Sequence, residues 1–260
     1  MTGPSQSSDV LPSAPAGVVF NPTQSFGGAQ FIFASEDGTI SAWSSGTQAT
    51  IKVDNSANAA RYNALAIGSN GTADLLYATN VSAGTVDVFT SSFTPAPMPS
   101  GAFTDPKMPP GYAPFGIQCI GGKVYVSFAR QSEVAQDDTT EADSGFVDIF
   151  DTNGALLQRS MMKGMLNSPW GLALAPTSFG DQGGKLWIGN FGDGKINAFD
   201  LTTGTSKPVN NNATGKPIVI DGLWALKFGN DGRGGSSNTL YFSAGPNGET
   251  DGLFGGLNPK

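Results

Sequence analysis

The stretch "SPWGLALAPTSFGDQGGKLWIGNFGDGKINAFD", Ser168–Asp200, decides the fold of this chain. It holds three short apolar runs that are separated by polar, glycine-rich turns. Short runs with alternating apolar and polar residues, bounded by such turns, are typical of β-strands. The stretch therefore predicts three consecutive antiparallel strands.

The same three runs recur along the chain roughly every 50 residues, which indicates a repeat architecture. The second runs are "FIFAS", "LLYAT", "VYVSF", "LWIGN" and "LYFSA", and the third runs include "GTISAW", "GTVDVF" and "GFVDIF". In the last of these, Val147 and Ile149 alternate with Asp148. Weaker fourth runs begin at Thr50, Ala155 and Pro217. The first runs begin at Gly17, Ala64, Gly116, Gly171 and Ala225.

Three or four short strands per repeat predict an all-β fold, the β-propeller, with five repeats visible. We expect a flexible N-terminal segment, residues 1–15, and then a single propeller domain over residues 16–257. Its repeats start near residues 16, 62, 113, 168 and 222. Either five blades form the propeller, or it has a six-bladed architecture that lacks its N-terminal blade.

Composition excludes several classes of function. The formal net charge is −7, which argues against a nucleic-acid partner because phosphate binding needs a basic surface. The sequence has no transmembrane segment, and no signal peptide is visible in this chain. Histidine is absent, so nucleophilic sites that depend on a histidine base are excluded.

We expect ligands on the face of the propeller where loops surround the central channel, since loops on a rigid scaffold carry function. Trp170 and Trp224 either pack between blades or form an aromatic rim for a ligand such as a sugar. Arg130 begins a long acidic loop, where it either clamps a carboxylate ligand or pairs with its acidic neighbours. The candidate ligand-binding residues are Asn63, Asn80, Arg130, Trp170, Asn190 and Trp224.

Asn80 and Asn190 are equivalent in the repeat, because each directly follows a second apolar run. One interpretation is a turn, which asparagine favours by bonding its own backbone. The other is a ring of oxygen ligands for Ca²⁺, the one cofactor that this pattern suggests. The candidate metal ligands are Asn80, Asn190, Asp193, Glu36 and Asp37.

The pattern "PWGLAL…KLWIGNFGDGKINAFD" and the ending "LYFSAGPNGETDGLFGGL" resemble a family of conserved hypothetical six-bladed β-propellers. Its members are secreted or surface proteins that are similar to NHL-repeat propellers. The resemblance covers nearly the whole chain and implies one further blade upstream, with its own Asn-Pro-Trp-Gly start. It implies no established activity.

Two functions remain open. The first is an extracytoplasmic or secreted binding module, whose ligand is a protein, a carbohydrate or a small molecule. The alternative is a calcium-dependent, lactonase-like hydrolase or lyase with a metal in the channel. We favour the first, and hence expect that the chain is not an enzyme, because no oxygen cluster has the spacing of a metal-binding loop.

Overall fold

A computed structural model describes residues 13–131, 145–160, 164–211 and 214–259. The chain divides into two compact units. Unit 1 comprises Met1–Val126 with Asp148–Arg159, and unit 2 comprises Ser127–Val147 with Ser160–Lys260. The units are described separately below. Among the described residues, no helix is long and apolar enough to span a membrane.

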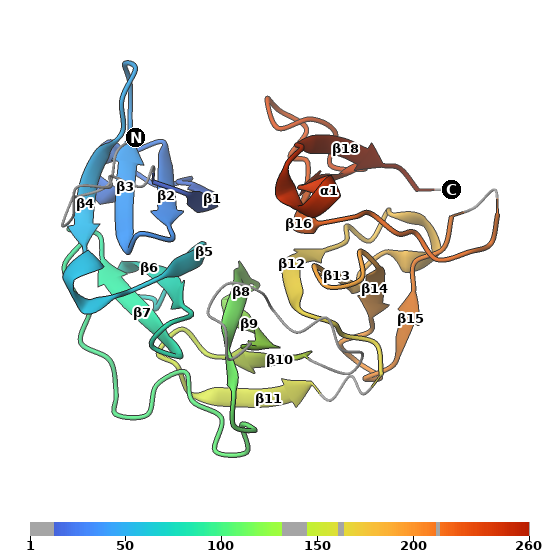
Figure 1. Ribbon diagram of the computed structural model, residues 1–260, viewed down its shortest axis with the longest axis horizontal. Helices are drawn as coiled ribbons and strands as arrows, with labels where there is room; N and C mark the ends of the chain where they lie inside the picture. Colours follow the sequence, from blue (N-terminus) through green and yellow to red (C-terminus); the bar gives the residue numbers. More distant parts are fainter. Residues whose placement is uncertain (1–12, 132–144, 161–163, 212–213, 260) are drawn as a thin grey trace. The chain divides into compact units, whose positions relative to one another are not determined.

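Five antiparallel sheets follow one another along the chain, and in each sheet the strands are neighbours in sequence order (Figure 1). We call these sheets blades 1 to 5. The prediction of an all-β propeller with five repeats is confirmed. Blade 1 contains β1 (Pro15–Phe20), β2 (Phe31–Ser35), β3 (Thr39–Trp43) and β4 (Thr50–Asp54). Blade 2 contains β5 (Tyr62–Ser69), β6 (Asp74–Asn80) and β7 (Thr85–Thr90).

The other three blades repeat this order. Blade 3 contains β8 (Tyr112–Ile120), β9 (Lys123–Arg130), β10 (Gly145–Phe150) and β11 (Leu156–Ser160). Blade 4 contains β12 (Pro169–Leu174), β13 (Leu186–Asn190), β14 (Ile196–Phe199) and β15 (Ser206–Pro208). Blade 5 contains β16 (Leu223–Phe228), β17 (Leu240–Ala244) and β18 (Leu253–Leu257). Short helical turns lie at η1 (Phe26–Gly28), η2 (Ser56–Asn58), η3 (Gly180–Gln182) and α1 (Pro246–Glu249).

The fourth strand of blade 4 differs from the sequence prediction. We expected it in the apolar run that begins at Pro217, but the chain forms β15 earlier, at Ser206–Pro208. The reason is a tight turn, in which the Asp200 side chain accepts hydrogen bonds from the backbone N–H groups of Thr202 and Thr203. The chain therefore reverses directly after β14 and pairs with it as β15. The run at Pro217 forms only isolated β-bridges.

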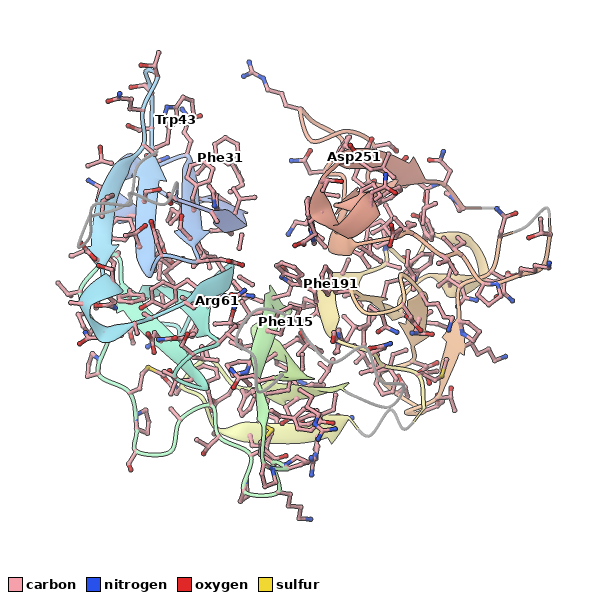
Figure 2. The ribbon with its side chains drawn as sticks, viewed as in Figure 1. Phe31, Trp43, Arg61, Phe115, Phe191 and Asp251 are labelled. Carbon is pink, nitrogen blue, oxygen red and sulfur yellow. The ribbon has the colours of Figure 1, made fainter. Side chains whose placement is uncertain are left out.

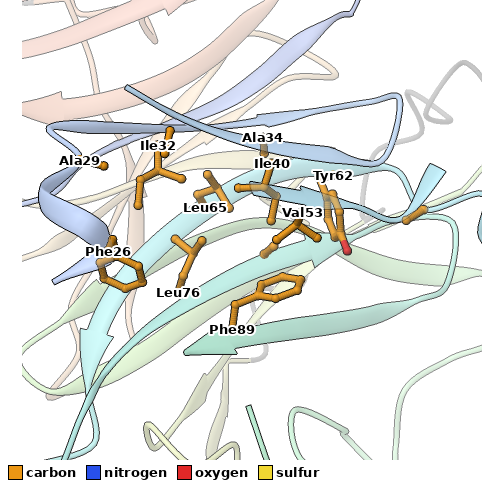
Figure 3. Close-up of a cluster of buried hydrophobic side chains, with 13 residues drawn as sticks. Phe26, Ala29, Ile32, Ala34, Ile40, Val53, Tyr62, Leu65, Leu76 and Phe89 are labelled. Atoms are coloured by element: carbon orange, nitrogen blue, oxygen red, sulfur yellow. The ribbon is translucent and has the colours of Figure 1, made fainter. Parts of the chain in front are cut away.

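Neighbouring blades pack face to face, and this packing builds the core of each unit. In unit 1, Ile32 and Ile40 of blade 1 share a buried cluster with Leu65, Leu76 and Phe89 of blade 2 (Figure 3). Each blade has one side that faces the next blade along the chain, and we call this side its following face. The opposite side, which faces the previous blade along the chain, is its preceding face.

Small residues on a following face let the next blade approach closely. A Cβ atom on Gly17 would lie 2.9 Å from the Cα atom of Ala64, nearer than real Cβ contacts occur. In unit 2, a Cβ atom on Gly171 of blade 4 would lie 2.8 Å from the backbone nitrogen of Leu226 of blade 5. Gly17 and Gly171, each at the start of a first run, therefore serve blade packing.

Candidate functional site

Arg61 connects residues of two blades on the loops of unit 1. The Arg61 guanidinium lies 3.1 Å from Oε1 of Glu36, which extends from blade 1. The Arg61 backbone N–H donates to Oδ1 of Asn80, at the end of β6, over 3.3 Å. Asp37 stays local, because its Oδ1 accepts from the backbone N–H and the hydroxyl of Thr39. The structure therefore brings together Glu36 and Asn80, and it adds Arg61, which the sequence analysis missed.

Asn80 also bonds within its own blade. Its Nδ2 donates to Oδ2 of Asp87 over 3.0 Å, and its Oδ1 accepts from the backbone N–H of Ala83. Tyr62 donates its hydroxyl to the same Asp87 oxygen over 2.8 Å and accepts from Asn55. Burial is the main reason why the pKa of Tyr62 is raised above its usual value. These bonds place Asn80 in the turn-forming role that we considered for it.

Asn63 is a buried polar residue on β5 of the same unit. Its Oδ1 atom is buried and has no hydrogen-bond partner within the described part of the chain. Most buried polar groups are hydrogen-bonded, so this unpaired oxygen is unusual.

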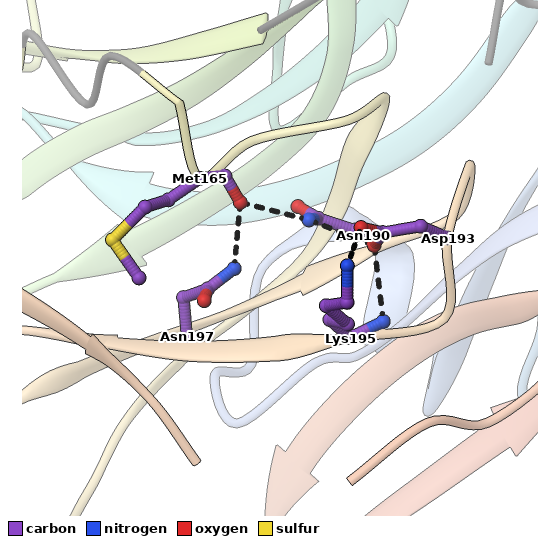
Figure 4. Close-up of polar contacts among 5 residues, drawn as sticks. All are labelled: Met165, Asn190, Asp193, Lys195 and Asn197. Carbon is purple, nitrogen blue, oxygen red and sulfur yellow. Dashed lines mark hydrogen bonds and ion pairs between the residues drawn. The ribbon is translucent and has the colours of Figure 1, made fainter. Parts of the chain in front are cut away.

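In unit 2, Asn190 anchors the loop that leads into blade 4 (Figure 4). Its Nδ2 donates to the Met165 carbonyl oxygen over 2.9 Å and to Oδ1 of Asp193 over 3.0 Å. Asn197 of the next strand donates to the same Met165 oxygen over 2.8 Å. Lys195 Nζ lies 2.9 Å from Oδ2 of Asp193. Asn190 thus donates a hydrogen bond to Asp193, and Lys195 already pairs with the Asp193 carboxylate.

No group of three or more histidine, cysteine, aspartate or glutamate side chains suited to a metal ion occurs among the described residues. Glu36 and Asp193 are each paired with a basic side chain. The calcium site stays a prediction.

Aromatic side chains lie near the starts of the first strands of blades 4 and 5. Trp170, at the start of β12, packs edge-to-face on Phe191, with ring centroids 5.8 Å apart. Figure 2 labels Phe191. Trp224 has the matching position on β16, the strand that packs against β12. All three rings are half-buried. We call Trp170, Phe191 and Trp224 the aromatic rim. Phe191 was missed because its run of glycine and aspartate indicated only a turn.

A polar loop lies beside the aromatic rim. The indole N–H of Trp224 donates to Oε1 of Glu249 over 2.7 Å. The Asn247 backbone N–H donates to Oδ2 of Asp221, and its side-chain amide donates to Oδ2 of Asp251 over 2.6 Å. These groups are exposed, so carboxylate oxygens border the rings on the surface.

Arg130, the remaining candidate, ends β9 and is exposed. The acidic residues that follow it fall in 132–144, outside the described residues. Its proposed ligand-clamping role therefore stays a prediction.

The least expected group is a buried aspartate in unit 1. Asp148 on β10 is fully buried, and neither of its carboxylate oxygens has a hydrogen-bond partner among the described residues. Burial, and then the charge of Asp105, raise the pKa of Asp148 from 3.8 to about 7, while Arg159 opposes this shift. Arg159 itself lies 3.0 Å from Oδ2 of Asp105. The alternating pattern placed Asp148 opposite Val147 and Ile149 but did not reveal that both faces of the strand are covered.

No family model matches this chain. It is similar to uncharacterised proteins of Acanthamoeba polyphaga mimivirus. One is 34% identical over 188 residues, which cover 71% of this chain and 46% of the relative. Another is 32% identical over 200 residues, which cover 75% of this chain and 51% of the relative. The chain thus spans about half the length of the relatives that it matches.

Among solved structures, the chain resembles β-propellers. One is a chain of the nidogen/laminin complex, with a TM-score of 0.56 and 12% identity over 96% of this chain and 82% of that chain. Another is regucalcin, a calcium-binding protein of Agrobacterium tumefaciens, with a TM-score of 0.59 and 10% identity over 89% of this chain and 67% of that chain. Identities this low establish the fold alone, which is similar to six-bladed propellers.

Proposed function

We propose that this chain is an extracytoplasmic, non-catalytic binding module that takes a carbohydrate on the aromatic rim. One observation carries the proposal: Trp170, Phe191 and Trp224 are half-buried at the loop ends of adjacent blades. Aromatic rings offer broad apolar faces together with a polar edge. Such rings suit the apolar faces of a sugar.

The surroundings of the rim support the same ligand class. Glu249 and Asp251 are exposed beside Trp224 and carry acceptor oxygens, which are suited to the hydroxyl groups of a sugar. The carboxylates of Glu249 and Asp251 and the net charge of −7 disfavour a polyanionic ligand. A neutral or amino sugar is therefore the best-matched chemistry.

The rim rests on rigid elements. The Ser127 hydroxyl donates to the carbonyl oxygen of Pro169, the residue before Trp170, and this bond is buried. Gly245 leaves space for the Trp224 ring, because a Cβ atom there would overlap it. Rings held in this way lose little conformational freedom when a ligand binds, which favours affinity.

The test is a screen against immobilised glycans, followed by calorimetric titration of each retained glycan. We expect Trp170→Ala and Trp224→Ala each to weaken binding at least tenfold, about 1.4 kcal/mol. Trp43→Ala, which removes a tryptophan from blade 1 of unit 1, is the matched control and should bind like the wild type. The proposal is refuted if no glycan is retained or if both rim variants bind normally.

The extracytoplasmic location is part of the proposal and rests on the low charged fraction of 13% and on the resemblance to secreted propellers. An antibody against the protein, applied to fractions of cells that carry the natural gene, tests it. We expect the signal outside the cytoplasm, and a purely cytoplasmic signal would contradict this part.

A further inference from the structure

A pocket of unit 1 lies where the following face of blade 1 meets the preceding face of blade 2. Its volume is about 390 Å³. Blade 1 lines it with β3, β4 and the loop after β1, and blade 2 lines it with the loop after β7. We call it the lysine pocket. Besides apolar side chains, its lining includes Gly27, Ser44, Thr50, Lys52, Ser91 and Ser92.

A β-bulge brings Lys52 to this pocket. Ile40 of β3 pairs with Val53 of β4, but the next residue, Ser41, pairs with Ile51. Lys52 is therefore the extra residue of the bulge, without a partner on β3. Neighbouring residues of a regular strand point to opposite faces, and a bulge changes the direction of a side chain. The bulge thus explains why Val53 packs in the cluster shared with blade 2 while Lys52 lines the pocket beside it.

Lys52 is the one charged residue among the described residues that line the pocket. Its ammonium group has no hydrogen bond or ion pair within the described part of the chain. The carboxylates nearby in the sequence have other partners, because Asp54 accepts from the Ser56 hydroxyl and Asp74 from the Ser25 hydroxyl. The pocket is therefore a local positive centre in a chain whose net charge is −7, and it attracts an anion.

Hydroxyl groups add hydrogen-bond donors to this charge. The hydroxyls of Ser44, Thr50, Ser91 and Ser92 make no hydrogen bond to any described residue of the chain, so each is available to a ligand. Gly27 has φ +63°, and a Cβ atom there would meet nothing within 4 Å, so its backbone is open to a close approach. A lysine ammonium together with several donors is suited to phosphate, which lysine binds as a point charge.

Two aromatic residues hold the pocket in shape. Phe26 and Phe93 line it, and their rings pack edge-to-face with centroids 5.6 Å apart. Phe26 belongs to the buried cluster between blades 1 and 2 (Figure 3). Both residues have left-handed backbone, with φ of +58° and +62°, which is rare for bulky side chains and persists only where packing enforces it. The two loops are therefore fixed before a ligand arrives, which favours affinity.

We propose that the lysine pocket binds the phosphate group of a small phosphorylated molecule. Lys52 and the hydroxyls hold the phosphate, and the rest of the molecule occupies the remaining space, since 390 Å³ lies within the range of small-molecule sites. A carboxylate is matched less well, because it favours the planar fork of an arginine. This site belongs to unit 1 and is independent of the aromatic rim, whose residues belong to unit 2.

A titration followed by the amide NMR signals tests the proposal, in a phosphate-free buffer at constant ionic strength. The probes are inorganic phosphate, glycerol 3-phosphate and glycerol. We expect both phosphates to shift the Gly27 and Ser92 signals with saturation, because these residues line the pocket from the two blades. Glycerol 3-phosphate should bind at least as tightly as phosphate, and glycerol should give no saturable shift.

Three variants assign the binding to the Lys52 charge. Lys52→Met should weaken both phosphates by about tenfold or more, whereas Lys52→Arg, which keeps the charge, should bind nearly like the wild type. Lys123→Met is the matched control, since Lys123 is an exposed lysine of unit 1 outside the pocket, and it should bind normally. Thermal melts verify that each variant is folded.

Several results would overturn the proposal. One is a wild type that saturates with neither phosphate, and another is saturable binding that leaves the Gly27 and Ser92 signals in place. Equal weakening by Lys52→Met and Lys123→Met would show an effect of net charge alone. Glycerol that binds as well as glycerol 3-phosphate would contradict phosphate recognition, and binding of inorganic phosphate alone would contradict a phosphorylated molecule as the ligand.

Discussion

Replacing Asp148 by asparagine should stabilise the protein above neutral pH. The side chain is fully buried, and its two oxygens have no hydrogen-bond partner among the described residues. Ionising such a group leaves a desolvated charge, which is why burial, reinforced by Asp105, raises its pKa to about 7. Asparagine has nearly the same shape and no charge to desolvate.

The magnitude follows from proton linkage. Between its ordinary pKa of 3.8 and about 7, Asp148 keeps its proton in the folded state and loses it in the unfolded state. Folding therefore takes up a proton, and the stability due to this group, complete below pH 3.8, is lost as the pH rises through about 7. A shift of roughly 3 units corresponds to about 4 kcal/mol of lost stability at pH 8.

Urea unfolding of the wild type and of Asp148→Asn, at intervals from pH 4 to pH 8, measures this difference. We expect the variant to be more stable by up to about 4 kcal/mol at pH 8, with the gap closing towards pH 4. Asp181→Asn, at an exposed aspartate, is the control and should follow the wild type. Parallel stability curves for the wild type and Asp148→Asn, or a variant that is less stable at pH 8, would refute the reasoning.

Three further outcomes are expected. Tyr62→Phe removes the buried hydroxyl that donates to Asp87, so urea unfolding should show a loss of about 1–3 kcal/mol; no loss would mean that the bond contributes nothing. Gly222→Ala should lower the melting temperature markedly, since Gly222 has φ +61° and a Cβ atom would overlap the Gly245 carbonyl oxygen; an unchanged melt would contradict this. Calcium and EDTA should give the same melting temperature, because Asn80, Asn190 and Glu36 already bond Asp87, Asp193 and Arg61; a higher melting temperature in calcium would support the metal site instead.

The sequence predicted the strands well because strand formation and hairpin pairing are local. Alternation and glycine-rich turns located the three strands of blade 2, and the equivalence of Asn80 and Asn190 followed from the repeat. The prediction failed for the run at Pro217, where the turn at Asp200 allowed an earlier strand. The position of this strand depends on the hydrogen bonds that the Asp200 side chain accepts in the turn.

The candidate site was predicted less completely. Trp170 and Trp224 were identified, but their companion Phe191 was not, because nothing in a turn sequence shows which ring it contacts. The pairing of Arg61 with Glu36 was also missed, since the two residues belong to different blades.

The sequence by itself determined the repeat, the all-β class and the number of visible blades, because each depends on residues close along the chain. Only the tertiary structure decided which faces of those blades are covered. Asp148 is buried on its strand. Ile196 of blade 4 is buried as well, whereas Phe254, at the equivalent position of blade 5, is exposed. The physical reason is that burial depends on a neighbouring blade some 50 residues away along the chain, and strand periodicity carries no information about that neighbour.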